Sequence, residues 1–335
     1  MSDSLIIFKN LKENISKSIL GQDHLIERLL IALLADGHLL VEGAPGLAKT
    51  RAIKTLGEMI EGDFHRIQFT PDLLPADVTG TEIYRPQEGI FQFQQGPIFH
   101  NLLLADEINR SPAKVQSALL EAMAENQVTV GGETYPLPRL FLVMATQNPI
   151  EQEGTYPLPE AQLDRFLLNV LIDYPSKENE LDIMRLVREE VFNSTKSVSI
   201  KNLKNDVKKN KIELKKITEE NIFKARFEVL NIYMSTELEK YMVEIIAATR
   251  SPESYSDDLA RLLTWGASPR ASLALDRCSR ARAWIRGRDF VTPEDIQDLV
   301  LDILRHRIIL SYEAESEAIT KEQVINKILE LVSVT

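Results

Sequence analysis

Short apolar runs alternate with amphipathic stretches through the first half of the chain. The runs lie at 38–41, 64–69, 102–105, 140–145 and 167–172. Each has the length of a strand and few polar residues, which is typical of strands buried inside a sheet. The stretches between them, such as 51–60, repeat apolar residues at helical spacing. The pattern therefore predicts an α/β arrangement in which strands and helices alternate.

The second half of the chain shows no convincing strand pattern and predicts a series of capped helices. Helix starts are expected at Ser176, at Thr218, at Thr236 with Glu239, at Thr292 and at Thr320 with Gln323. We therefore expect two units, an α/β unit at 1–175 and a helical unit at 176–335. Within the first unit, Ser111 is expected to cap the helix that follows the strand at 102–105.

Two stretches of the first unit have the pattern of hairpins. Residues 70–98 place apolar residues, among them Tyr84, on both sides of a turn that contains proline and glycine. This stretch is expected to be an insertion, serving either as a contact surface or as an edge hairpin. Residues of about 127–138 alternate on both sides of Gly131 and Gly132, which is a strong signal for a second hairpin.

The composition is that of a globular protein with room for two domains. The chain has 335 residues, of which 44% are hydrophobic and 27% charged. No apolar run approaches the ~20 residues that a membrane span needs, and the N-terminus lacks the pattern of a signal peptide. Cys278 is the only cysteine, so no disulfide can form within the chain. These features together favour a reducing, cytoplasmic setting.

The net charge of −11 disfavours a protein that binds nucleic acid regardless of sequence. Such proteins normally carry a basic excess, because phosphate contacts dominate their affinity. The acidic balance instead favours a protein partner. The five histidines are scattered without a partner at ligand spacing, so the sequence predicts no zinc site.

A glycine-containing loop after the strand at 38–41 ends in Lys-Thr where the next helix begins. It consists of Gly43, Ala44, Pro45, Gly46, Leu47, Ala48, Lys49 and Thr50. Strand, loop and helix in this order are typical of P-loop nucleotidases, which bind phosphates with backbone amides and a helix N-terminus. Lys49 would reach the β- and γ-phosphates, and Thr50 would bind Mg²⁺. The alternative is a plain Gly-Pro turn, because the strict pattern has glycine in place of Ala48.

Asp106 and Glu107 follow a buried strand, and the carboxyl end of a parallel strand faces the ligand in open α/β sheets. Asp106 could hold Mg²⁺ through its hydration shell, and Glu107 could polarise the attacking water. Two solvated acids at a strand end are the alternative. Their position about 56 residues after the P-loop lysine favours the functional interpretation.

Three further polar residues and one joint are candidates for the same chemistry. Asn148 follows another buried strand and could bind the γ-phosphate or the water, although an Asn-Pro turn is the alternative. Arg165 could pair with Asp164 or act as an arginine finger on a neighbouring subunit's nucleotide. Arg270 opens a helix, where the dipole disfavours a cation, so it could contact a phosphate or form a salt bridge.

The joint between the first two helices contains Ile19, Gly21 and Gln22. A glycine-marked joint just before a P-loop unit could wrap an adenine ring, and a plain turn between helices is the alternative.

Several long strings of residues resemble the MoxR family of AAA+ ATPases. They are Leu103–Met123, Ala145–Phe166, Gly266–Ala271, Gly287–Pro293 and Leu304–Arg307. The resemblance covers about residues 5–312, and Ala-Lys-Thr in the P-loop is common in this family. It implies a P-loop NTPase αβα core with a five-stranded parallel sheet, followed by a small all-helical lid domain.

The resemblance also implies roles for the residues above. Residues 43–50 would be Walker A, and Asp106 with Glu107 would be Walker B. Asn148 would be sensor 1, Arg165 the arginine finger and Arg270 sensor 2. The segment with Ile19, Gly21 and Gln22 would lie on the adenine side. The hairpins would be the helix-2 insert and the pre-sensor-1 hairpin.

The family forms hexameric rings of chaperone-like ATPases, often with partners that carry a von Willebrand factor A domain. We therefore expect ATP hydrolysis with Mg²⁺ at subunit interfaces, driving movement against a protein client. A DNA-remodelling motor and a nucleotide-gated scaffold with negligible turnover are the alternatives. The lysine-rich strip from Lys196 to Lys216 is the least family-like part and is expected to be a solvated loop or short helix.

Overall fold

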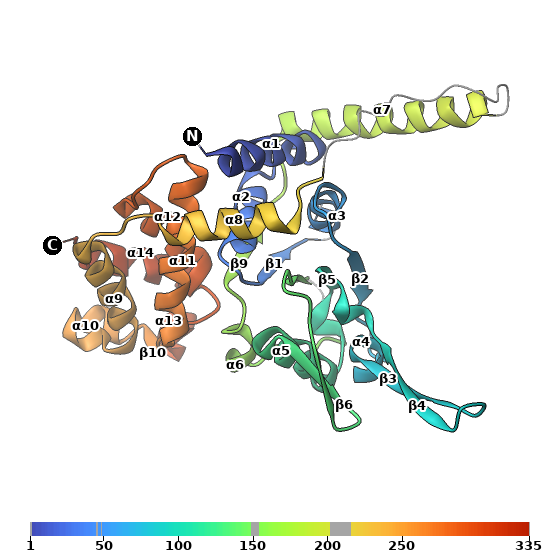
Figure 1. Ribbon diagram of the computed structural model, residues 1–335. Helices are drawn as coiled ribbons and strands as arrows, with labels where there is room; N and C mark the ends of the chain where they lie inside the picture. Colours follow the sequence, from blue (N-terminus) through green and yellow to red (C-terminus); the bar gives the residue numbers. More distant parts are fainter. Residues whose placement is uncertain (1, 45, 48, 149–153, 202–215, 335) are drawn as a thin grey trace.

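The computed structural model describes residues 2–44, 46–47, 49–148, 154–201 and 216–334. Five strands form one parallel sheet in the order β2-β5-β8-β1-β9 (Figure 1). They are β1 (Leu39–Gly43), β2 (Phe64–Gln68), β5 (Leu102–Asp106), β8 (Leu142–Gln147) and β9 (Leu168–Ile172). The predicted five-stranded parallel sheet is confirmed.

Helices cover both faces of the sheet because successive strand residues point to opposite sides. Leu39 and Val41 join the larger of two buried clusters, with α1 (Asp3–Ser18), α2 (Asp23–Leu34) and α3 (Lys49–Met59). Leu40 joins the other cluster, which includes residues of α5 (Ala113–Glu125). Short elements complete this unit, namely α4 (Pro75–Thr79), η1 (Pro97–Phe99), η2 (Ile108–Arg110) and α6 (Glu160–Leu163).

Both predicted hairpins are present, and they touch each other. One is β3 (Gly80–Arg85) with β4 (Ile90–Gln95), and the other is β6 (Gln127–Val130) with β7 (Glu133–Pro136). Phe93 of the first stacks on Tyr135 of the second with ring centroids 4.1 Å apart. The β3–β4 hairpin extends away from the sheet in Figure 1, and its Tyr84 and Phe91 are exposed.

The second half of the chain is almost entirely helical. Its elements are α7 (Lys177–Lys201), α8 (Glu219–Leu230), α9 (Thr236–Arg250), η3 (Pro252–Ser254), α10 (Asp257–Ala260), β10 (Leu263–Trp265), α11 (Pro269–Ile285), α12 (Pro293–Leu304), β11 (Ile309–Leu310), α13 (Tyr312–Ser316) and α14 (Lys321–Leu331). The expectation of no strand was wrong in one detail: β10 and β11 form a short antiparallel pair. Pairs of two or three residues are too short to leave an alternating pattern.

Most helix starts agree with the sequence, and two do not. Ser176, Thr218 and Thr320 accept hydrogen bonds from first-turn amides as expected. Thr292 is the N-cap of α12, where its amide and hydroxyl donate to Asp295. In α9 the cap is Ser235 rather than Thr236, so the predicted Thr236–Glu239 box is wrong by one residue. Ser111 does not cap α5, because its hydroxyl donates to the Ile108 carbonyl and the helix begins after Pro112.

The lysine-rich strip is only partly described. Helix α7 continues to Lys201, which is further than the sequence predicted, and it extends away from the other helices in Figure 1. Most of the strip, residues 202–215, lies outside the described residues. Among the helices that the structure describes, none is long and apolar enough to cross a membrane.

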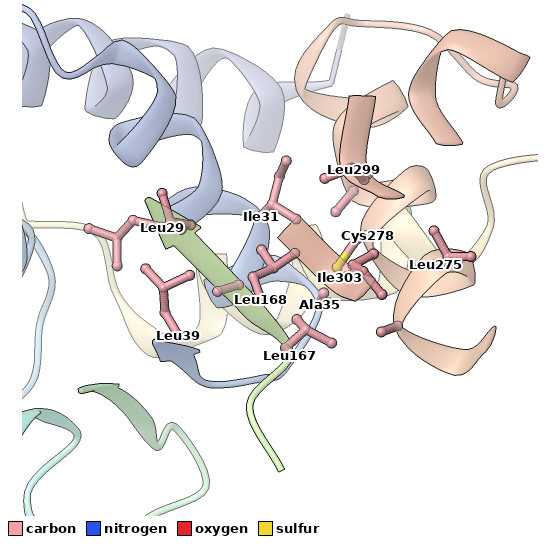
Figure 2. Close-up of a cluster of buried hydrophobic side chains, with 14 of the residues drawn as sticks. Leu29, Ile31, Ala35, Leu39, Leu167, Leu168, Leu275, Cys278, Leu299 and Ile303 are labelled. Atoms are coloured by element: carbon pink, nitrogen blue, oxygen red, sulfur yellow. The ribbon is translucent and has the colours of Figure 1, made fainter. Parts of the chain in front are cut away.

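The helical half and the sheet share one hydrophobic core. Figure 2 shows Leu29 and Ile31 of α2 and Leu168 of β9 in the same cluster as Cys278 of α11 and Ile303 of α12. All five side chains are at most 1% exposed. Burying a side chain of this size stabilises the fold by about 2 kcal/mol. Separating the two halves would therefore expose a continuous apolar surface on each of them.

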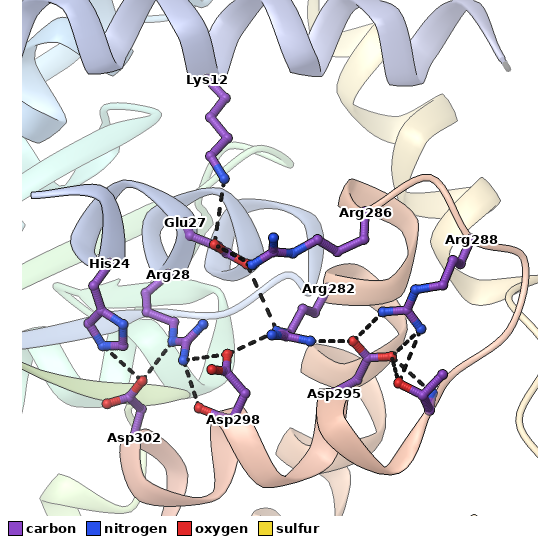
Figure 3. Close-up of polar contacts among 11 residues, drawn as sticks. Lys12, His24, Glu27, Arg28, Arg282, Arg286, Arg288, Asp295, Asp298 and Asp302 are labelled. Carbon is purple, nitrogen blue, oxygen red and sulfur yellow. Dashed lines mark hydrogen bonds and ion pairs between the residues drawn. The ribbon is translucent and has the colours of Figure 1, made fainter.

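Ion pairs at the rim of this core join α1 and α2 to α11 and α12 (Figure 3). Arg28 on α2 donates from Nε to Asp302 at 2.6 Å and from Nη2 to Asp298 at 2.9 Å. Glu27, the preceding residue, accepts from Arg286 at 3.1 Å. Burial raises the pKa of Asp302, but the hydrogen bond from His24 and the charge of Arg28 lower it more, so its pKa is about 2.

Replacing Asp302 with Asn should destabilise the fold by about 3 kcal/mol at neutral pH, because it leaves the buried Arg28 without its main counter-ion. The pKa of Asp302 is lower in the folded chain than its ordinary value of 3.8. Its ionised form therefore stabilises the fold above about pH 4, and this contribution is lost as the pH falls toward 2. The difference from wild type in urea unfolding should accordingly shrink between about pH 4 and about pH 2.

The matched control is Asp182→Asn, which removes an exposed carboxylate paired with Arg185. It should change the free energy of unfolding by less than about 0.5 kcal/mol. A loss for Asp302→Asn that is no larger than for this control would contradict the role assigned to the pair.

Candidate active site

The loop between β1 and α3 lies at the carboxyl edge of the sheet. Gly43 ends β1, and a Cβ added to it would lie 2.7 Å from the carbonyl oxygen of Ile172, so this position excludes any side chain. Gly46 has a φ of 84°, in the left-handed region that glycine adopts freely. Lys49 and Thr50 form the first turn of α3, where free backbone amides favour an anion. Pro45 and Ala48 lie outside the described residues.

Lys49 points back across the loop rather than into solvent. Its side-chain amine donates to the carbonyl of Gly43 at 2.7 Å and to that of Gln147 at 3.4 Å. Burial lowers the pKa of Lys49 below its ordinary value. The negative charges of Asp106, Glu107 and Glu42 act in the opposite direction and raise the pKa, but by less. A cation held by the carbonyls that end β1 and β8 is available to a phosphate, because neutral acceptors hold it less strongly than an anion would.

Asp106 ends β5 and has partners on both carboxylate oxygens. Oδ1 accepts from the hydroxyl of Thr146 at 2.5 Å. Oδ2 accepts from Arg66 twice, from Nε at 3.1 Å and from Nη2 at 2.6 Å. Arg66 lies on β2 and Thr146 on β8, the two strands that flank β5 in the sheet. The neighbouring strands therefore orient this carboxylate.

Glu107 has a backbone conformation that is uncommon for residues with a side chain. Its φ of 57° and ψ of 49° lie in the left-handed region, and its amide donates to the hydroxyl of Thr146 at 2.9 Å. Its side chain accepts from Gln68 at 2.7 Å and pairs with Arg110 at 3.3 Å. Strained residues of this kind cluster at functional sites, where the surrounding structure holds them.

These groups line one cavity of about 370 Å³. Its walls are Gly46, Leu47, Lys49, Thr50, Arg51, Arg66, Asp106, Glu107 and Asn148. Asn148 follows β8 and is 6% exposed. The cavity thus combines a helix N-terminus and cations, which suit phosphate, with carboxylates that could position water.

The donor set fits Mg²⁺ better than a metal enclosed by protein ligands. Thr50 and Asp106 supply the oxygen ligands that Mg²⁺ prefers, and Mg²⁺ usually needs only one or two protein ligands when substrate phosphates supply others. Within the part of the chain that the structure describes, no group of three or more His, Cys, Asp or Glu residues could hold a metal ion.

The joint between α1 and α2 does not line this cavity. Gly21 has a φ of 75°, and a Cβ on it would lie 2.8 Å from the side chain of Asn179 on α7. Gln22 donates to the carbonyl of Asp173 at 3.3 Å, and Ile19 is buried in the shared core. Of these predicted nucleotide residues, only Gly21 therefore lies against the start of α7. Their contact with adenine remains a prediction.

Arg165 and Arg270 meet at a second cavity, of about 390 Å³, that also has Arg277 and Arg307 in its walls. The alternative in which Arg165 pairs with Asp164 was wrong. Asp164 instead accepts from Arg307 at 2.8 Å and from Ser268 at 2.7 Å. No ion pair of the Arg165 or Arg270 side chain appears in the described portion of the structure.

This arginine-lined cavity lies at the opposite edge of the sheet from the P-loop. It includes Gly37 and His38 before β1 and Leu167 before β9, whereas the P-loop follows β1. The register pairs Leu39 with Leu168 and Gly43 with Ile172. Five residues of strand therefore separate the edges, a span of ~16 Å.

The sequence analysis did not identify the side chains that hydrogen-bond to the carboxylates of Asp106 and Glu107. Arg66 and Gln68 alternate with apolar residues on the edge strand β2, and Thr146 is two residues before Asn148. The only signal in the sequence that could have identified these partners was a polar residue close to a predicted site residue. The pairing of β2 with β5, which places Gln68 opposite Asp106, was needed to assign the partners.

Two family descriptions match this chain. Residues 38–168 match the ATPase family associated with various cellular activities (AAA), and residues 258–328 match the AAA lid domain. A solved structure from Cytophaga hutchinsonii, described as a candidate ATPase, is 46% identical. The match has a TM-score of 0.86 and covers 99% of this chain and 96% of that one. The fold and the lid thus agree with known ATPases.

Relatives of similar length carry the resemblance across nearly the whole chain. Chaperone MoxR1 of Mycobacterium tuberculosis is 45% identical over 95% of this chain and 80% of its own. Protein YeaC of Bacillus subtilis is 44% identical over 96% of this chain and 93% of its own. Protein MoxR of Paracoccus denitrificans is 31% identical over 95% of this chain and 94% of its own. The chain therefore belongs to the MoxR family of AAA+ ATPases and is an ATP hydrolase.

Proposed function

We propose that this ATPase is a chaperone-like, Mg²⁺-dependent motor that works as an oligomeric ring, expected to be hexameric, and remodels a protein client. The observation that carries the proposal is the convergence of Lys49, Thr50, Asp106, Glu107 and Asn148 on one cavity at the carboxyl edge of the sheet. The chaperone character is supported by the similarity to chaperone MoxR1.

The chain's own residues would divide the work of hydrolysis. Lys49 and the first-turn amides of α3 would bind the phosphates, and Thr50 and Asp106 would hold Mg²⁺. The metal would neutralise charge on the β- and γ-phosphates. Glu107 would orient the attacking water, with Asn148 beside the γ-phosphate. In-line attack by water depends mainly on such positioning and charge neutralisation.

Arg165 and Arg270 would act on the nucleotide of a neighbouring subunit. They lie together on the edge of the sheet opposite their own P-loop, ~16 Å or more away. In a head-to-tail ring this edge can face the P-loop of the next subunit, where the two cations would offset developing negative charge. The position of Arg270 beside Arg165 supports an action on the neighbouring subunit rather than within its own.

The two units at 1–175 and 176–335 would move together rather than as separate bodies. Their shared core and the ion pairs of Arg28 and Glu27 support this arrangement.

The touching β3–β4 and β6–β7 hairpins would contact the client. The net charge of −11 favours a protein client over nucleic acid, and a von Willebrand factor A domain protein is the expected partner class. We place the protein in the cytoplasm.

Glu107→Gln should bind ATP with nearly unchanged affinity but hydrolyse it at least ~100-fold more slowly, because an amide orients water without accepting its proton. Calorimetry would measure binding, and phosphate release would measure turnover. Lys49→Ala is the matched comparison, and it should lose binding itself. Unchanged turnover of Glu107→Gln would remove this residue from the mechanism.

Mixing two inactive variants should restore activity if the arginines act on a neighbour. Arg165→Ala keeps a complete P-loop, and Glu107→Gln keeps the arginines. At equal amounts in random rings, about a quarter of interfaces would join an intact P-loop to an intact arginine face, giving about a quarter of wild-type turnover.

The same experiment with Arg270→Ala tests sensor 2 separately. Turnover of the mixture no greater than the sum of the separate variants would show that the arginine acts within its own subunit. The mixture of Arg165→Ala with Arg270→Ala is the control. It should stay well below the other mixtures, since both variants lack part of the same face.

A further inference from the structure

Arg66 pairs with Asp106, which is the carboxylate that we expect to hold the metal in this cavity. Its Nε and Nη2 atoms lie 3.1 and 2.6 Å from Oδ2 of Asp106. An oxygen with two donors has no free lone pair for a third partner. The other oxygen, Oδ1, already accepts from Thr146 at 2.5 Å. A metal ion or metal-bound water therefore gains full access to Oδ2 only when the guanidinium leaves.

Lys49, another cation of the cavity, is bound to backbone carbonyls. Its amine is within hydrogen-bonding distance of the Gly43 and Gln147 carbonyls. Arg66, by contrast, hydrogen-bonds to Asp106 directly. Both side chains line the cavity, so the pair is formed where a nucleotide would enter.

The pair is poorly placed to serve the fold. The side chain of Arg66 is 48% exposed, and β2 is already joined to β5 by a backbone ladder from Phe64 to Gln68. Half-exposed ion pairs contribute little to stability. Nη2 also donates to the side-chain oxygen of Gln68 at 2.8 Å, so the half-exposed guanidinium is held on the solvent side by a second side chain of β2.

We propose that Arg66 is an internal substitute for Mg²⁺. It neutralises Asp106 when the site holds no metal and releases it when the metal arrives with the nucleotide. The Arg66–Asp106 pair and access of the metal or its bound water to Oδ2 of Asp106 are thus mutually exclusive. This inference rests on the proposed function, since it takes Asp106 as the carboxylate on the metal side.

The proposal predicts opposite effects of Arg66→Ala on two binding reactions. Without the competing cation, less Mg²⁺ should be needed for tight binding of a non-hydrolysable ATP analogue, by about tenfold. In EDTA the same analogue should bind more weakly, because the uncompensated carboxylate repels its phosphates. Arg66→Lys, which keeps the charge, should stay closer to wild type in both measurements.

The experiment titrates Mg²⁺ into the full chain with a fluorescent, non-hydrolysable ATP analogue and repeats the binding in EDTA. Lys54→Ala is the control, because this exposed lysine lies on α3 outside the walls of the cavity. The ratio of dissociation constants without and with Mg²⁺ should rise about tenfold or more for Arg66→Ala. It should change less than about twofold for Lys54→Ala.

Three results would overturn the proposal. Weaker binding of the analogue in both Mg²⁺ and EDTA, with an unchanged ratio, would make Arg66 a phosphate ligand. An unchanged ratio with a lower unfolding temperature would make it a structural residue. If wild type binds no analogue at all, the proposed function fails together with this inference, whereas normal wild-type binding with an unshifted variant refutes the inference alone.

Discussion

The common register of the parallel strands is the constraint on which the site depends. Strands β1, β5 and β8 run in one direction and end at one edge, with Ala105 opposite Ala145 and Leu40 opposite Ala145. The residues that follow these strands therefore converge, although the P-loop and Asn148 are about 100 positions apart in the sequence. A slip of one residue in any strand would turn its side chains to the other face of the sheet.

The second feature is the continuity between the sheet and the helical half. Helix α2 packs its apolar residues on β9 and on α11 and α12, and its Arg28 and Glu27 pair with carboxylates and arginines of the same helices. Helix α2 also contacts α3, the helix that begins at Lys49, so it lies between the P-loop helix and the helical half. The buried charges also make the contact specific, because removing either partner leaves the other uncompensated.

The third feature is the separation of the two charged cavities. One holds the acids and Lys49 at the carboxyl edge of the sheet, and the other collects four arginines at the amino edge. Asp36 and Asp164 also line the second cavity, and Asp164 pairs with Arg307, so two acids face the four arginines there. The two cavities are therefore separate within one chain, and the proposal that they complement each other between copies starts from that separation.

Much of this could be predicted from the residues alone. Strands buried on both faces leave continuous apolar runs. Gly43, Gly46, Lys49 and Thr50 mark a candidate phosphate site, because the geometry of such a site depends on consecutive backbone positions. The caps at Thr218 and Thr320 could be predicted for the same reason, since a cap acts within one turn of its own helix.

The tertiary structure decided the contacts between distant residues. That Arg66 and Thr146 hold Asp106, that Arg307 rather than Arg165 pairs with Asp164, and that Cys278 lies in a core shared with α2 cannot be derived from local spacing. Each of these contacts depends on which strands lie side by side and how helices pack on them. Local sequence determines the strands, turns and caps because their hydrogen bonds span a few residues, whereas packing alone determines which side chains meet across the fold.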